Sequence, residues 1–212
     1  MLPIMKKTPT GSLAVAAAAI AFLLASQFEV LPIPRRAVSA PLRHWYLAEG
    51  YTGPGFQEYI CMGNAGSSPA AITVRFLFNG APFLEASCTV PPQSRHTVDV
   101  NSVVGRGREV SAMISAAQGD ISIERSLYFI YRDGAPGSHF VQAAGTAART
   151  WYFAEGYTGP GFDEYVTVLN PGNRPAALRF HFQAACGEVL RTGTVAANSR
   201  ETFKVNDLLG EN

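Results

Sequence analysis

The sequence predicts an all-β protein built from antiparallel strands. Apolar and polar residues alternate with a period of two over many short segments, as they do in strands with one face in water. Glycine, proline and asparagine separate these segments and mark turns. A long motif also occurs twice, which indicates two related segments in tandem.

The composition is that of a globular chain without a nucleic-acid-binding surface. The chain has 212 residues, of which 47% are hydrophobic and 16% charged, with 20 glycines and 14 prolines. That glycine and proline content lies well below the level of disordered or collagen-like chains. Seventeen basic and sixteen acidic residues give a net charge of +1. A basic face that binds nucleic acid is therefore not expected.

The first 40 residues have the features of an export segment. Lys6 and Lys7 precede the uncharged apolar run 13–24, an order typical of a secretory signal peptide. The run is shorter than the roughly 20 residues that span a bilayer. A small-x-small cleavage sequence, Ala-Val-Ser at 37–39, follows two arginines. We expect residues 1–40 to be a signal peptide or an N-terminal membrane anchor, and the remainder to be extracellular or on the cell surface.

A twelve-residue motif organises the rest of the chain. The sequence WYLAEGYTGPGF begins at Trp45 and returns as WYFAEGYTGPGF at Trp151, and 15 of the 22 positions from each tryptophan are identical. The spacing of 106 residues suits tandem domains better than the short units of a solenoid. We expect a complete β-sandwich repeat over 41–147, here called the first copy, and a truncated β-sandwich repeat over 151–212, the second copy.

The first four strands of the first copy follow from the motif and from turn signals. The first strand, 44–48, opens the motif, and the second, 57–62, follows its Gly-Pro-Gly loop. Apolar and polar residues alternate in the third, 71–78. Asn79-Gly80 then predicts a two-residue hairpin turn into the fourth strand, 83–90.

Four further strands complete the predicted first copy. Two prolines precede 95–100, and Gly119-Asp120 precedes 121–130. The other two candidates are 109–115 and 139–143, and no stretch after residue 44 has a helical apolar stripe. Seven or eight short strands in about 100 residues favour an antiparallel sandwich of immunoglobulin-like type. An up-and-down barrel is the alternative.

The second copy lacks the segments that correspond to 110–131 and 139–145. A sandwich without them leaves unpaired edges and an uncovered apolar face. Three explanations remain open. The sequence is a fragment of a longer gene, or the short copy packs on its neighbour or on a second molecule, or strands are donated between chains.

The motif resembles a family of bacterial, actinobacterial-type cell-surface tandem repeats. The resemblance rests on the WY-[LF]-AEGYTGPGF-x-EY segment, the later Ser-Arg, Ile-Glu-Arg-Ser-Leu-Tyr at 123–128 and Gly-Ser-His at 137–139. Members are repeats of about 100 residues in long exported proteins, without an assigned activity. The resemblance implies a β-sandwich building block and supplies no catalytic residues.

The repeated aromatic loop is the main candidate site. Aromatic rings flank the Gly-Pro-Gly turn beside carboxylates, and three interpretations are open: packing, stacking on sugar rings, and calcium binding through the acidic oxygens. The candidate ligand-binding residues are Tyr51, Phe56 and Glu58 with their counterparts Tyr157, Phe162 and Glu164.

Other reactive side chains give weaker signals. Cys61 and Cys88 lie on predicted strands and could form a disulfide or remain free thiols, and neither position is a cysteine in the second copy. The four histidines are scattered, so no metal site is expected apart from the calcium alternative. Arg125 lies on the apolar side of its strand and, if buried, needs a carboxylate or carbonyl partner.

These observations predict a non-catalytic, exported structural or adhesive module. The alternative is a carbohydrate-binding accessory module that uses the aromatic loop. Hydrolase, zinc-protease and nucleotide-binding motifs do not occur in the sequence, so an enzyme is not expected. Expected partners are other surface proteins, glycans or a second molecule bound through the incomplete copy. The membrane is contacted through the N-terminal segment alone.

Overall fold

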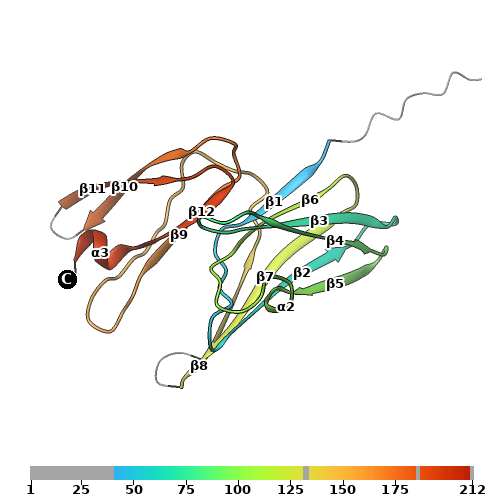
Figure 1. The fold of residues 1–212 in the computed structure, drawn as a ribbon, viewed down its shortest axis with the longest axis horizontal. Coiled ribbons are helices and arrows are strands. Elements are labelled where there is room, and N and C mark those ends of the chain that lie inside the picture. The colour runs from blue at the N-terminus through green and yellow to red at the C-terminus, as the bar shows by residue number, and fades with distance from the viewer. Residues whose placement is uncertain (1–40, 131–133, 185–186, 211–212) are drawn as a thin grey trace, which may run out of the picture. The chain divides into compact units, whose positions relative to one another are not determined.

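The first copy folds into two four-stranded antiparallel sheets (Figure 1). The strand order of the first sheet is β1(Arg43–Leu47), β6(Ser111–Ala116), β3(Ala70–Leu77), β4(Leu84–Val90). The strand order of the second sheet is β5(Ser94–Asp99), β2(Phe56–Asn64), β7(Ile121–Ile130), β8(Pro136–Gln142). The computed structural model describes residues 41–130, 134–184 and 187–210. The export segment expected over residues 1–40 therefore lies outside the described residues.

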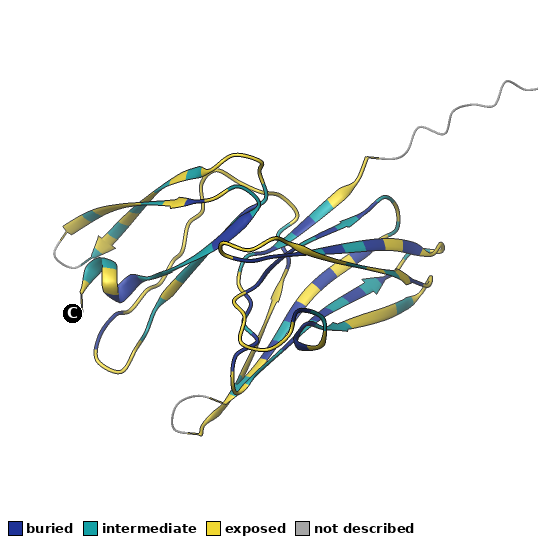
Figure 2. Ribbon diagram, viewed as in Figure 1, coloured by how far each residue is buried: buried dark blue, intermediate teal, exposed yellow. Residues whose placement is uncertain are grey.

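The two sheets enclose one apolar core (Figure 2). Ile60 and Ile123 enter it from β2 and β7, and Ile72 and Ile114 enter it from β3 and β6, each at most 1% exposed. Burial alternates along β2 and β7 because successive side chains of a strand point to opposite faces. The predicted all-β class with antiparallel sheets is confirmed, and the arrangement is consistent with a β-sandwich.

The second copy contains two pairs of strands. β9(Tyr165–Asn170) pairs with β12(Ser199–Lys204), and β10(Ala176–Ala184) pairs with β11(Gly187–Val195), both antiparallel. At the equivalent sequence positions of the first copy, β2 pairs with β5 and β3 with β4. The strands of the two copies thus share these pairings.

Two short helices lie where the sequence predicted only strands and turns. They are α2(Val100–Val104) and α3(Val205–Leu209). The Asp99 carboxylate accepts a hydrogen bond from the Ser102 backbone N–H at 3.2 Å and caps α2, and Gly105, with φ of 85°, ends it. Five residues are too few for an apolar stripe, so the periodicity missed both helices. Among the described residues, no helix is long and apolar enough to cross a membrane.

The connection between β3 and β4 differs from the predicted two-residue turn. The pairing of β3 with β4 ends at Phe76 opposite Leu84, β3 itself ends at Leu77, and residues 78–83 form the loop that contains Asn79-Gly80. Phe78 is 6% exposed and belongs to the core. Because the Phe78 ring is buried in the core, the chain leaves the β3–β4 ladder before Asn79-Gly80. The predicted hairpin is therefore confirmed, and the predicted two-residue turn is wrong.

An asparagine at the end of β2 holds two loops together. Asn64 is buried, and its Oδ1 accepts the Gly66 N–H at 3.0 Å. Its Nδ2 donates at 2.9–3.1 Å to the carbonyls of Ser68, Val90 and Pro91. Asn170 at the end of β9 makes the equivalent set, to Gly172 and to the carbonyls of Arg174, Val195 and Ala196. Backbone groups of two loops are thereby satisfied by one side chain.

Replacing this asparagine tests its role. We expect Asn64→Ala to lower the free energy of unfolding by about 2–4 kcal/mol, because it leaves several buried backbone groups without partners. Urea unfolding followed by circular dichroism measures the change. Asn173→Ala, at an exposed loop position of the second copy, is the control and should stay within about 0.5 kcal/mol of the parent. Equal stability of both variants would contradict the assignment.

Candidate functional site

The two candidate aromatic pairs are built alike. The rings of Tyr51 and Phe56 meet edge to face with centroids 4.8 Å apart, and those of Tyr157 and Phe162 do so at 5.0 Å. A Cβ placed at Gly53 would overlap the Tyr51 ring, so the glycine lets the ring fold over the loop. The structure thus brings together the tyrosine and phenylalanine of each motif.

The surroundings of the two pairs differ. Phe56 also stacks on Phe129 of β7, with centroids 5.5 Å apart, and both Tyr51 and Phe56 are half-buried. In the second copy Tyr157 is 54% exposed and Phe162 is 62% exposed. Strand β7 therefore covers the first pair, and the described part of the second copy has no strand in the equivalent position.

Two side chains hold the aromatic loop of the first copy against α2. The Thr52 hydroxyl donates to the Gly105 carbonyl at 2.8 Å and accepts the Arg108 backbone N–H at 3.1 Å. Asn101 donates to the Phe56 carbonyl and accepts the backbone N–H of residue 58, both at 2.9 Å. All of these contacts lie within the first copy, so the loop is tied to the domain that carries it.

Glu58 lies inside the first copy. Its side chain is 2% exposed, and its Oε2 has no hydrogen-bonding partner among the described residues. A Cβ at Gly50 would come within 2.7 Å of both carboxylate oxygens, so the glycine makes room for the acid. Burial raises the pKa of Glu58 to about 7, against the opposing attraction of the Arg125 guanidinium. The group would therefore carry a fractional charge near neutral pH.

Arg125 is the buried cation beside this acid. It lies on β7 opposite Ile60 and is 2% exposed. One terminal nitrogen donates to the Glu49 backbone carbonyl and the other to the Glu49 carboxylate at 2.7 Å. The sequence prediction that a buried Arg125 needs a carboxylate or a carbonyl is confirmed, and here one residue supplies both.

The second copy retains the acids without the arginine. Glu155 and Glu164 correspond to Glu49 and Glu58, and a Cβ at Gly156 would come within 2.6 Å of the Glu164 carboxylate. Asn206 accepts the backbone N–H of Glu164 at 2.9 Å, as Asn101 does at residue 58. Within the described ranges, neither Glu155 nor Glu164 has an ion-pair partner. The two acids of the motif therefore lie beside a buried arginine in the first copy, and without an ion-pair partner among the described residues in the second.

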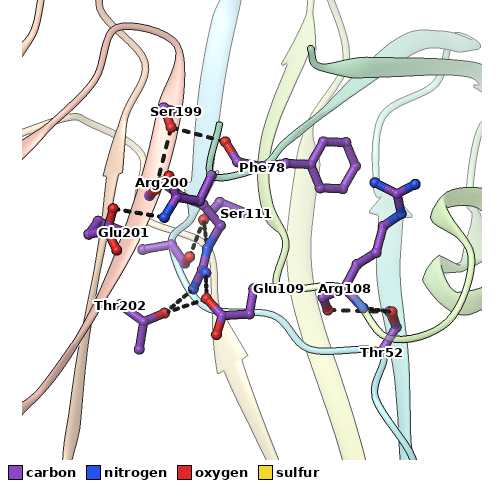
Figure 3. A network of polar contacts seen from close by, with 11 residues as sticks. Thr52, Phe78, Arg108, Glu109, Ser111, Ser199, Arg200, Glu201 and Thr202 are labelled. Carbon is purple, nitrogen blue, oxygen red and sulfur yellow. Dashed lines mark hydrogen bonds and ion pairs between the residues drawn. The ribbon is translucent and has the colours of Figure 1, made fainter. Parts of the chain in front are cut away.

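A second buried arginine connects the two copies (Figure 3). Arg200 of β12 is 2% exposed, and Figure 3 shows its guanidinium among Glu109, Ser111 and Thr202. It forms an ion pair with the Glu109 carboxylate and donates at 3.3 Å to Ser111 and at 2.7 Å to Thr202. Its counterpart in the first copy, Arg95, is exposed. The arginine at this position is therefore buried and paired in the second copy and exposed to solvent in the first.

The neighbouring serines differ in the same way. The Ser94 hydroxyl donates to the Pro91 carbonyl at 2.9 Å, a hydrogen bond within the turn that precedes β5. Ser199 instead donates at 3.0 Å to the carbonyl of Phe78 in the first copy. The Ser-Arg pair of the second copy thus contacts the first copy through both side chains.

The remaining candidate side chains lie apart. Cys61 on β2 and Cys88 on β4 are free thiols in different sheets, and Cys88 packs on the core, so the disulfide considered from the sequence is not formed. His181 is exposed, and its Nδ1 lies 2.9 Å from Oε1 of Glu188. In the described ranges, no group of three His, Cys, Asp or Glu side chains is placed to hold a metal ion.

Several structural residues were not recognised in the sequence. Thr52 and Asn101 recur as Thr158 and Asn206, and both pairs are buried. The recurrence of these residues at the motif spacing could have marked them as structurally important. It does not reveal their hydrogen-bonding partners, which lie more than 40 positions away in the chain. Glu109, the partner of Arg200, has no counterpart in the sequence of the second copy, so recurrence gave no signal for it.

Comparisons with known proteins give no family. No family model and no curated protein matches the chain. Among solved structures, the crystal structure of Thermotoga maritima 1070 is similar over 49% of this chain and 94% of that chain, with 16% identity and a TM-score of 0.46. The Anabaena sensory rhodopsin transducer is similar over 39% of this chain and 93% of that chain, with 22% identity and a TM-score of 0.36.

The protonation of Glu58 predicts a pH dependence of stability. Because its pKa is near 7 in the folded chain and about 4.5 in the unfolded chain, the folded state binds more protons between those values. Its contribution to stability is full below pH 4.5 and is lost as the pH rises to about 7. We expect Glu58→Gln to be more stable than the parent by about 3 kcal/mol at pH 8 and nearly equal at pH 4.

Urea unfolding of both proteins from pH 4 to pH 8 measures this difference. Glu124→Gln removes an exposed carboxylate from β7 and serves as the control. Its offset from the parent should be small and independent of pH. A Glu58→Gln offset that stays constant over the range would contradict the raised pKa.

Proposed function

We propose that this chain is a non-catalytic building block of an exported, cell-surface or secreted protein. In this proposal, immunoglobulin-like β-sandwich units in tandem serve as a spacer or adhesive scaffold. One observation carries it: side chains of the repeated motif hold the first copy together. Thr52 bonds to backbone groups near α2, Glu49 binds Arg125, and the Tyr51 and Phe56 rings pack on one another. The resemblance to bacterial surface repeats supports the same role.

A carbohydrate-binding accessory module is the second candidate, and one observation favours it. The Tyr157 and Phe162 rings are more than half exposed, and Glu155 lies in the same motif. Exposed aromatic rings beside polar groups stack on sugars in binding sites. The candidate site in the second copy has these features, whereas Glu58 in the first copy is buried.

Matched double substitutions distinguish the two candidates. We expect Tyr51→Ala with Phe56→Ala to lower the free energy of unfolding by about 2–4 kcal/mol, since it removes packed rings. The same substitutions at Tyr157 and Phe162 should cost less than about 1.5 kcal/mol because those rings are largely exposed.

Retention on insoluble peptidoglycan and chitin is measured for the same proteins. A scaffold predicts no retention that depends on Tyr157 or Phe162. Retention by the parent, lost in the second-copy variant with unchanged unfolding, would reject the scaffold and support the carbohydrate-binding module.

Export predicts a defined N-terminus. If residues 1–40 are a cleaved signal, the secreted protein should begin close to Ala40, after the Ala-Val-Ser sequence. Mass spectrometry of protein recovered from the medium and from membranes measures this. Met1 retained on membrane-bound protein would favour the anchor, and Met1 retained on protein without membrane association would contradict export.

A further inference from the structure

Three aromatic side chains lie together on the outer face of one sheet of the first copy. Burial alternates along β2 and β7, so the side chains that do not enter the core point away from it. Tyr59, Tyr128 and Phe140 occupy such outward positions on the neighbouring strands β2, β7 and β8 (Figure 1). We call these three residues the aromatic face. It is separate from the six candidate ligand-binding residues of the two aromatic loops.

The register of the sheet brings the three residues together. Ser126 of β7 lies opposite Tyr59 on one side and opposite Phe140 on the other. Tyr128, two positions further along β7, is therefore a diagonal neighbour of both, at about 7–8 Å between Cα atoms. The rings of Tyr59 and Tyr128 meet edge to face, with centroids 6.1 Å apart and planes at 74°. The two rings thus form a corner rather than a closed stack.

The aromatic face is exposed to solvent. Phe140 is 77% exposed, Tyr128 is 53% exposed and Tyr59 is half-buried. The outward side of an antiparallel sheet ordinarily carries polar side chains in water. A cluster of exposed rings at such positions therefore marks a binding site.

The area of the aromatic face is small for a protein partner. At about 150–250 Å² for a whole aromatic side chain, the exposed parts of Tyr128 and Phe140 amount to roughly 200–330 Å². Ile130, also outward on β7 and 59% exposed, extends this surface by less than one further ring. A stable protein–protein interface covers about 800 Å² on each partner. The exposed area suits a few sugar rings better than a second protein.

Hydrogen-bonding side chains surround the rings. The outward positions in the same and the adjoining rows of the sheet are occupied by Gln57, Asp99, Glu124, Ser126, Ser138 and Gln142. The Nε2 of Gln57 donates to the Asp99 carboxylate at 2.9 Å, which fixes the amide beside Tyr128. Sugar sites combine aromatic surface with a few polar groups of this kind, which bind the hydroxyls at the edge of the sugar ring.

The charges beside the rings favour an uncharged ligand. Among the described outward positions, the charged residues nearest the rings are Asp99, opposite Tyr59, and Glu124, two positions before Ser126. The outward Arg95 lies two rows beyond Asp99 on β5. Two carboxylates next to the rings would repel a uronate or a phosphate-bearing glycan, whereas a neutral sugar chain meets no such repulsion.

We propose that the aromatic face of the first copy binds an uncharged, β-linked glycan of the glucose or N-acetylglucosamine type. These sugars carry their substituents at the ring edge, so their apolar ring faces can stack on Tyr128 and Phe140. Gln57 and Glu124 then lie beside the edge hydroxyls. The inference goes beyond the proposed function, because a scaffold needs no sugar and the second candidate uses the rings of the loop.

Cellohexaose and chitohexaose are the probes, and the full chain is titrated with each by isothermal titration calorimetry. We expect at least one of them to bind. Phe140→Ala and Tyr128→Ala should each weaken binding about tenfold, because each removes a stacked ring. Phe140→Tyr keeps the ring and should bind like the parent. Both side chains are more than half exposed, so the variants should unfold at nearly the urea concentration of the parent.

Matched controls place the site on the first copy. Phe153→Ala removes a ring of similar exposure, 73% against 77% for Phe140, from the second copy and should bind like the parent. The double variant Tyr157→Ala with Phe162→Ala should also bind like the parent, which separates this site from the loop. Hexagalacturonate, an acidic chain of the same length, should bind more weakly than the neutral probe.

Four outcomes would overturn the proposal. The first two are no binding of either neutral probe, and unchanged affinity in both Phe140→Ala and Tyr128→Ala. The third is a preference for hexagalacturonate. The fourth is a dimer, seen by sedimentation at higher chain concentration, that Phe140→Ala abolishes, since the face would then belong to a second molecule. None of these outcomes affects the scaffold proposal, which is tested by unfolding and by the loop variants.

Discussion

Arg125 carries a positive charge from β7 into the interior of the first copy, where it meets the repeated motif. Its guanidinium binds the Glu49 carbonyl and carboxylate and lies close enough to Glu58 to lower the cost of that buried acid. The Arg125 side chain is 2% exposed whereas that of Glu49 is 53% exposed, so losing the acid would leave a buried charge with one partner fewer. The contacts of Arg125 thereby join strand β7 to the motif, which leads into β2.

The motif is a structural site whose state depends on the strand beside it. Where β7 is present, Phe56 stacks on Phe129 and Glu58 is buried. Where the described chain has no such strand, the equivalent ring, Phe162, and the acid Glu164 remain at least partly exposed. The same residues therefore lie largely inside the domain in the first copy and are more exposed in the second. The contacts they make locally are nearly identical in the two copies.

Buried arginine also connects the copies to each other. Arg200 pairs with Glu109 and Ser111 of the first copy, whereas Arg95 at the equivalent position lies in solvent. The Arg200 side chain is buried whereas that of Glu109 is 52% exposed, and desolvation of the guanidinium offsets part of the attraction between them. A shared sequence position thus serves as a contact between copies in one case and as a surface residue in the other.

The sequence by itself determined the all-β class, the strand positions of the first copy, the motif and the demand of Arg125 for an oxygen partner. These depend on alternation and turns, which are local. The tertiary structure alone decided which acid Arg125 binds, why the pKa of Glu58 is raised, why Phe78 lies outside the β3–β4 ladder and why Arg200 is buried. Each of these depends on groups far apart in the chain, and burial and charge pairing are fixed only once the sheets pack.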